Sequence, residues 1–235
     1  MRKVRPQDVK DDFASFVTER RAYFDRVEAA LKGTQHEKRD MSTLSETTLQ
    51  STYVAFECFL SDLILAYVNR DFSQYQIDIE GRIKQSIESR FGQWASQATS
   101  FTSRSHIKVD DLETILTPES DNLTFKDVET LKQRCVAIVA APHRNAIVNL
   151  SDSDSRLIDT VHAIRNFIAH RSPKAKATMN QRLASIVSGV GCPNENLSRG
   201  TYDIGNIGAF LKAEVAGSRR INLYLSRLSS IAAAM

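Results

Sequence analysis

The sequence predicts an all-α protein. Its apolar residues recur at spacings of three and four, which is the period of an amphipathic helix rather than a strand. Glycine and proline are scarce, with 9 and 5 in 235 residues, which argues against turn-dense all-β chains. Apolar residues make up 42% and charged residues 25%, as in an average globular protein. We find no repeat or linker and expect one all-α domain over residues 1–235.

The N-terminal third predicts two helices. A first helix is expected over residues 8–31, with Gly33 as its stop. The polar stretch 33–43 is expected to be a loop. Residues 45–69 predict a second, long helix that is apolar nearly all round, as is typical of the central helix of a bundle.

The middle of the chain gives weaker signals. A third helix is expected over 77–94, and the Ser/Thr-rich stretch 95–122 is expected to hold loop and one short helix. Another helix is expected over 124–139, with Asp127 in a capping pair at its start. Pro142 should end or redirect that helix.

The last third predicts two more helices. One begins among the capping residues of SDSDS and runs to about residue 171, ahead of Pro173. Its apolar stripe is Leu157, Val161, Ile164 and Ile168. Residues 172–206 are expected to be partly loop, and a long C-terminal helix is expected over 205–231.

Cysteine usage and hydropathy favour a reducing, cytoplasmic setting. The three cysteines are odd in number and far apart, so neither a disulfide framework nor a zinc ribbon is expected: Cys58, Cys135 and Cys192. The most apolar run, 53–68, is interrupted by acids including Glu57, so we expect no membrane span. The first residues have no apolar core of a secretory signal.

The helix before Pro173 carries the most distinctive chemistry. With a 100° step, His162, Asn166 and His170 form one row opposite the apolar stripe, with Arg165 beside it. Residues 160–194 contain five basic residues and no acid: Arg165, Arg171, Lys174, Lys176 and Arg182. We therefore expect an anion-facing surface here, with His162, Arg171, Lys174 and Lys176 as candidate phosphate contacts.

Arg165 to His170 read R-N-x-x-x-H. This string resembles the R-x4-H motif of ribonucleases of the HEPN superfamily (higher eukaryotes and prokaryotes nucleotide-binding), in which a polar residue often follows the arginine. The full string with asparagine arises by chance in about one such chain in a hundred. The similar Arg144–Asn149 stretch ends in asparagine and is interpreted as a chance match.

The resemblance implies a helical bundle that dimerises so that two motifs meet in one cleft. His170 would then transfer protons, Arg165 would hold the phosphate and stabilise the added charge, and Asn166 would orient one of them. It implies a metal-independent endoribonuclease without a cofactor. The products would carry a 2′,3′-cyclic phosphate, and DNA would not be cut. It also implies a toxin or antiviral defence effector, with an antitoxin or defence-system protein as a possible partner.

Other interpretations fit the same residues. A catalytically silent HEPN-type module could bind RNA, a nucleotide or a partner protein, and a helical interaction subunit would have no nucleic-acid role. A metal site from Asp159, His162 and His170 is disfavoured because no second acid or cysteine cluster accompanies it. On a regular helix Arg165 and His170 point about 140° apart, so their convergence requires the helix to end near His170 or a partner subunit to contribute.

Overall fold

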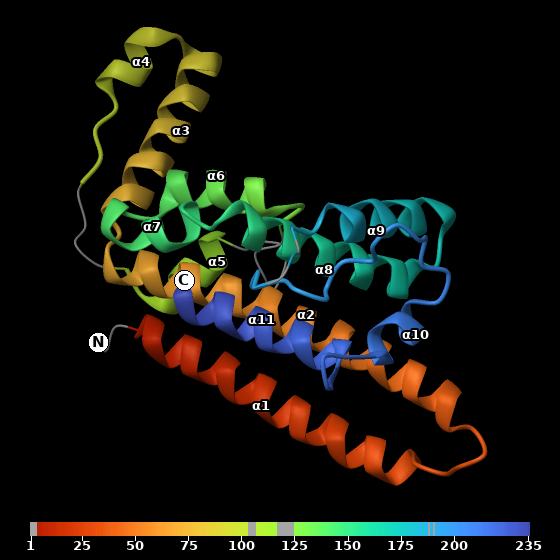
Figure 1. The fold of residues 1–235 in the computed structure, drawn as a ribbon. Helices are drawn as coiled ribbons and strands as arrows, with labels where there is room; N and C mark the ends of the chain where they lie inside the picture. The colour runs from red at the N-terminus through yellow and green to blue at the C-terminus, as the bar shows by residue number, and fades with distance from the viewer. Residues whose placement is uncertain (1–3, 103–106, 117–124, 188, 190) are drawn as a thin grey trace. The chain divides into compact units, whose positions relative to one another are not determined.

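The structure is a computed structural model that describes residues 4–102, 107–116, 125–187, 189 and 191–235. The predicted all-α class is confirmed, since helices dominate this part of the chain and one two-stranded hairpin is added (Figure 1). The chain divides into two compact units. Unit 1 comprises residues up to Val9 together with Leu60–Asn149, and unit 2 comprises Lys10–Phe59 and Leu150–Met235. We describe each unit by itself, and the single domain stays a prediction.

Unit 2 contains most of two long N-terminal helices and the C-terminal third of the chain. Its elements are α1 (Pro6–Leu31, from Lys10 onwards), α2 (Glu37–Arg70, up to Phe59), α8 (Asp152–His170), α9 (Pro173–Ser185), α10 (Ile207–Lys212), β1 (Glu214–Val215), β2 (Ser218–Arg219) and α11 (Arg220–Ala234). An aromatic cluster joins α1 to α2, with the Phe13 ring 5.6 Å from Phe56 and 5.0 Å from Phe59. The α8 stripe is buried at Leu157, Val161 and Ile164 as predicted, whereas Ile168 is half-buried.

The predicted loop over residues 33–43 is mostly wrong. Helix α1 ends at Leu31 as expected, and Gly33 has a φ of +78°. Helix α2 then begins at Glu37, eight residues before the predicted start. The Glu37 carboxylate accepts a hydrogen bond from the Gly33 amide at 2.8 Å, and Met41 is buried. The polar residues of this stretch are therefore the solvated side of an amphipathic first part of α2.

The predicted long helix over residues 205–231 is also wrong. It is divided into α10 and α11 by the hairpin β1–β2, in which Glu214 pairs with Arg219 and Val215 with Ser218. Ala216 and Gly217 turn the chain with positive φ values of 50° and 75°. Two such residues between paired strands form a compact hairpin turn. The sequence does not indicate this turn, because the apolar residues on either side of it keep the spacing of a helix.

Helix α9 occupies part of the stretch expected to be partly loop. The Ser172 hydroxyl accepts a hydrogen bond from the Ala175 amide at 3.2 Å, and Pro173 opens the first turn. Proline fits that position because its fixed φ suits the start of a helix and its missing N–H would be unpaired there.

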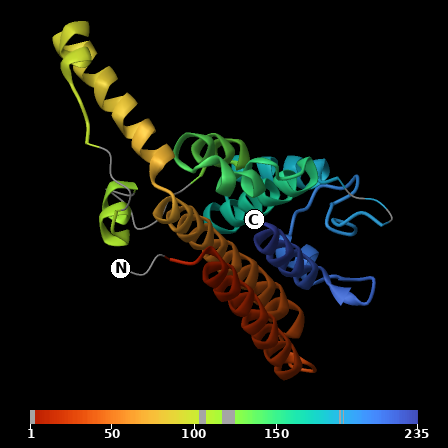
Figure 2. The ribbon, with the colours of Figure 1, turned by 90° about the vertical axis from the view of Figure 1, so that its left-hand side faces the viewer.

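Within its described residues, unit 1 contains the start of α1, the end of α2 and five shorter helices. These are α3 (Ser73–Phe91), α4 (Gln93–Ala98), α5 (Val109–Leu116), α6 (Val128–Ile138) and α7 (Ala141–Val148). Asp127 is itself the N-cap of α6 and accepts from the Thr130 amide at 2.8 Å, whereas the predicted start at 124 lies outside the described residues. Pro142 lies in the first turn of α7 and so redirects the chain, as predicted. The far half of α3 and α4 extend beyond α6 and α7 (Figure 2).

Helix α2 is long and apolar enough to cross a membrane by length and composition alone. Of its most apolar window, 67% is buried inside the structure. The core helix of a soluble protein has the same length and composition, so the expectation of no membrane span stays a prediction.

Candidate active site

Helix α8 has defined ends that follow from its sequence. The Ser151 hydroxyl accepts a hydrogen bond from the Asp154 amide at 3.0 Å and caps the N-terminus. The helix ends at His170, because Arg171 adopts the left-handed conformation with φ 50° and ψ 21°. The chain then enters α9 through Pro173. The helix therefore ends at the histidine, which is one of the two conditions under which Arg165 and His170 can serve one phosphate.

Arg165 is half-buried against α2. Its Nη2 lies 3.7 Å from Oε2 of Glu57, and its Nη1 donates a 3.0 Å hydrogen bond to Oδ1 of Asn166. The Arg165 side chain is 31% exposed and that of Glu57 is 19% exposed. The buried Nε of Arg165 has no hydrogen-bond partner among the described residues. One side of the guanidinium is thus held in place, while a donor remains unsatisfied.

Glu57 is an acid on the predicted apolar helix, and its burial has an electrostatic consequence. Burial raises the pKa of its carboxyl group above the ordinary value, and the nearby Arg165 guanidinium opposes that rise without cancelling it. The carboxylate therefore holds Arg165 at a cost in desolvation.

His162 contacts α2 as well. Its Nδ1 lies 3.1 Å from the Tyr53 hydroxyl, and the two rings meet edge to face with centroids 5.6 Å apart. Burial raises the pKa of the Tyr53 phenol far above its ordinary value, and the carboxylates of Glu57 and Asp159 add to the rise. The phenol is therefore neutral, and either group can donate in this hydrogen bond, depending on the imidazole tautomer.

The predicted row on the outer face of α8 is therefore wrong in its orientation. His162 and Asn166 are half-buried, and only His170 of the three is exposed. The reason is that α8 contacts α2 through Tyr53 and Glu57 and also packs against α9. The apolar stripe therefore underestimates the buried part of α8, because α2 and α9 both cover it.

The exposed end of α8 carries the remaining candidate residues. His170, Lys174 and Lys176 are all exposed, and no side chain in the described part of the protein pairs with theirs. Asn166 contacts Arg165, and no hydrogen bond joins Arg165 to His170 among the described residues. Arg182 forms an ion pair with Asp159 at 3.5 Å, which neutralises part of the basic segment.

Arg171 differs from the two lysines because it is already engaged. Its Nη2 forms a close ion pair with Oε2 of Glu46, and its guanidinium lies 5.2 Å from the centroid of the Phe167 ring. Oε1 of Glu46 accepts a 3.1 Å hydrogen bond from the Gly208 amide. A Cβ at Gly208 would lie 2.8 Å from that same oxygen, so the close approach requires glycine. Arg171 thus helps to fasten the end of α8 to α2 and α10.

Sequence reasoning missed Tyr53 and Glu46. Tyr53 and Glu57 are four residues apart on α2 and face His162 and Arg165, which are three apart on α8. An acid and a tyrosine one turn apart on an otherwise apolar helix could have signalled a buried polar partner. Within the described residues no group of three or more histidine, cysteine, aspartate or glutamate side chains could hold a metal ion.

The chain was also compared with protein-family models, curated proteins and solved structures, and no match was found in any of the three comparisons.

Proposed function

We propose that the protein is a metal-independent endoribonuclease that cleaves RNA by attack of a 2′-hydroxyl on the adjacent phosphate, acting as a homodimer. The resemblance of Arg165–His170 to the HEPN ribonuclease motif supports the proposal, and with it a role as a toxin or antiviral defence effector. The observation that carries it is Arg165. Its guanidinium is held by Glu57 and Asn166, and the side chain is still 31% exposed. It lies about one and a half turns before an exposed histidine at the helix end.

The proposed chemistry needs three functions at one phosphate. A base removes the proton of the 2′-hydroxyl, whose oxygen attacks phosphorus, and an acid protonates the departing 5′-oxygen. Positive charge stabilises the phosphorane, which the planar fork of Arg165 can supply with two donors to two oxygens. The products are a 2′,3′-cyclic phosphate and a 5′-hydroxyl.

One protomer offers one His170, whereas the reaction needs a base and an acid. A twofold axis through the motif would supply two histidines and two arginines in one cleft. The exposed Lys174 and Lys176 on the first turn of α9 would contact flanking phosphates. The half-buried His162, engaged by Tyr53, and the exposed Arg171, engaged by Glu46, would support the site through these contacts.

RNA and DNA of the same sequence, incubated with the protein in excess EDTA, test the proposed chemistry. We expect cleavage of the RNA alone, with cyclic phosphate ends, since DNA has no 2′-hydroxyl to attack. Cleavage of DNA, or of RNA to 5′-phosphate ends, would contradict the proposal.

Mixing the unaltered protein with His170→Ala tests the shared cleft. A mixed dimer would contain one His170, whereas the reaction needs a base and an acid. We expect activity to fall with the square of the unaltered fraction after subunit exchange, because only dimers of two unaltered protomers have both histidines. Activity that falls in simple proportion to the unaltered fraction would contradict a cleft built from both protomers.

A catalytically silent module is the second candidate. The ion pair with Glu57 favours it, because the acid already offsets part of the Arg165 charge. Such a module would bind RNA, a nucleotide or a partner protein equally well with and without the His170 imidazole.

A further inference from the structure

Two aromatic side chains stand exposed at the far end of unit 1. We call residues 82–102, which include the second half of α3 and all of α4, the distal arm. Phe91 at the end of α3 is 66% exposed, and Trp94 in α4 is 74% exposed. Trp94 is the one tryptophan of the chain. Large aromatic residues usually bury most of their surface, so two neighbouring exposed ones indicate a binding surface.

The backbone between them fixes this presentation. Gly92 has φ 86° and ψ 168°, a region that essentially only glycine occupies. The chain therefore turns sharply after Phe91 and begins α4 at Gln93. Helix α4 packs back on α3 and buries Ser96, which leaves Trp94 outside. The two exposed rings thus flank a sharp turn inside the chain rather than a terminus.

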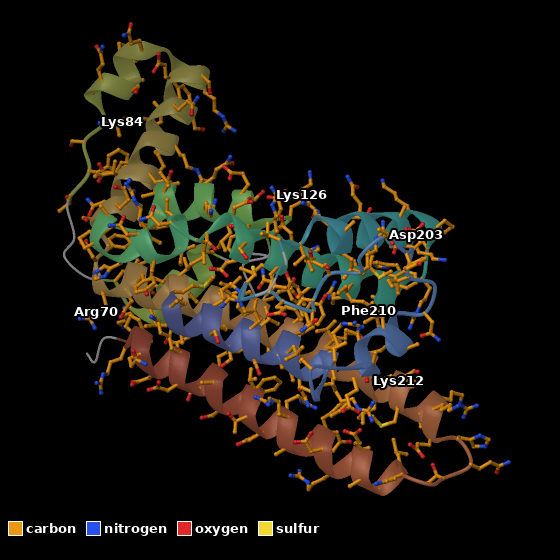
Figure 3. All side chains as sticks on the ribbon, viewed as in Figure 1. Arg70, Lys84, Lys126, Asp203, Phe210 and Lys212 are labelled. Atoms are coloured by element: carbon orange, nitrogen blue, oxygen red, sulfur yellow. The ribbon has the colours of Figure 1, made fainter. Side chains whose placement is uncertain are left out.

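Positive charge accompanies the aromatic residues. The distal arm has three basic residues, Arg82, Lys84 and Arg90, against one acid, Glu88, which gives a net charge of +2. Lys84 lies two helical turns before Phe91 on the same side of α3, about 10 Å away along the axis. Its ammonium is 5.8 Å from the centroid of the Phe101 ring, and Figure 3 labels it on the arm.

The rest of the distal arm exposes mainly polar side chains, together with Ile83, which is 40% exposed. The exposed amides and hydroxyls are Gln85, Ser86, Ser89, Gln93, Gln97 and Ser100. Proteins bind single-stranded nucleic acids through aromatic faces that stack bases and through cations that follow the phosphate backbone. Neutral hydrogen-bonding groups accompany these side chains. An acyl chain would instead need a continuous apolar face.

We propose that the distal arm binds single-stranded RNA, with bases stacked on Trp94 and Phe91 and phosphates held by Lys84 and Arg90. The choice of RNA rests on the proposed function. The arm itself supplies no catalytic residue. It adds a binding site separate from the R-x4-H motif and sets a preference for unpaired substrate, because bases within a duplex cannot stack on a protein side chain.

The test measures binding of labelled oligouridylate of about ten nucleotides by fluorescence anisotropy, in a His170→Ala background that prevents cleavage. One stacked base is worth about 1–3 kcal/mol, so Trp94→Ala should weaken binding by about 5- to 150-fold. Tyr202→Ala is the matched control, because Tyr202 is 81% exposed in unit 2 and should leave the affinity unchanged. Duplex RNA of equal length should bind more weakly and should not respond to Trp94→Ala.

The single tryptophan gives an independent readout. We expect oligouridylate to quench Trp94 emission, whereas a blue shift on vesicles of anionic lipid without a response to RNA would identify a membrane surface and overturn the proposal. Unchanged RNA affinity in Trp94→Ala would also overturn it. These outcomes distinguish the two proposals. If the unaltered protein binds RNA through the arm but does not cleave it, only the ribonuclease proposal is contradicted. If the protein cleaves RNA and Trp94→Ala has no effect, only the arm proposal is contradicted.

Discussion

Replacing Glu57 by glutamine tests how the candidate site holds its arginine. At an effective dielectric constant of about 20, unit charges 3.7 Å apart attract by about 4.5 kcal/mol. Taking the carboxylate out of water costs several kcal/mol, so the two contributions nearly cancel. The raised pKa of Glu57 indicates that desolvation is the larger. We therefore expect Glu57→Gln to raise the free energy of unfolding at pH 8 by up to about 1 kcal/mol.

The pH dependence of the free energy of unfolding follows from the raised pKa of Glu57. Because the pKa of Glu57 is raised in the folded protein, the folded state binds the proton more tightly than the unfolded chain. The stabilisation that the protonated Glu57 side chain contributes is present at low pH. It is lost as the pH rises through the pKa of Glu57 in the folded protein. The advantage of Glu57→Gln should therefore be much smaller near pH 4, where the carboxyl group is largely protonated in both states.

Urea denaturation at pH 8 and pH 4 measures the difference. Glu46→Gln is the matched control on the same helix, since its carboxylate forms an ion pair with Arg171 and accepts from the Gly208 amide. Here we expect a loss of about 1 kcal/mol at pH 8. If Glu57→Gln were instead destabilising at pH 8 and neutral at pH 4, the ion pair with Arg165 would outweigh burial, and the reasoning would be refuted.

Two further predictions concern packing around α8. Tyr53→Phe removes the hydroxyl that contacts His162 and should lower the free energy of unfolding by about 0.5–1.5 kcal/mol, because one hydrogen bond to a half-buried imidazole is lost; an unchanged urea midpoint would contradict this. Gly208→Ala should cost about 1–3 kcal/mol, since the new Cβ would lie 2.7 Å from a backbone oxygen. Gly205→Ala, with nothing within 4 Å, should leave the melting temperature nearly unchanged, and equal losses in both would refute the steric argument.

The sequence predicts the elements with strong local signals. Helix α1 ends where Gly33 follows it, and α8 ends one residue from its predicted end, because Pro173 restricts the chain before it. The hairpin between α10 and α11 was missed because its flanking residues keep a helical period, while its turn depends on two positive φ values.

The candidate site shows a similar limit. The motif on α8 is visible in the sequence, but its partners are not, because they come from α2, about a hundred residues earlier. Glu57 could be noted as an acid on an apolar helix, whereas its pairing with Arg165 is a tertiary contact. Likewise, Arg171 looks like a free cation in the sequence and is paired with Glu46 in the fold.

The most direct test of the ribonuclease proposal compares the unaltered protein with His170→Ala on mixed cellular RNA in excess EDTA. His170 is exposed, so the variant should unfold within about 0.5 kcal/mol of the unaltered protein. We expect cleavage by the unaltered protein and a loss of about 100- to 10,000-fold in the variant, the usual contribution of one general acid or base. Equal cleavage by both proteins, or cleavage that stops in EDTA, would contradict a metal-independent ribonuclease that depends on His170.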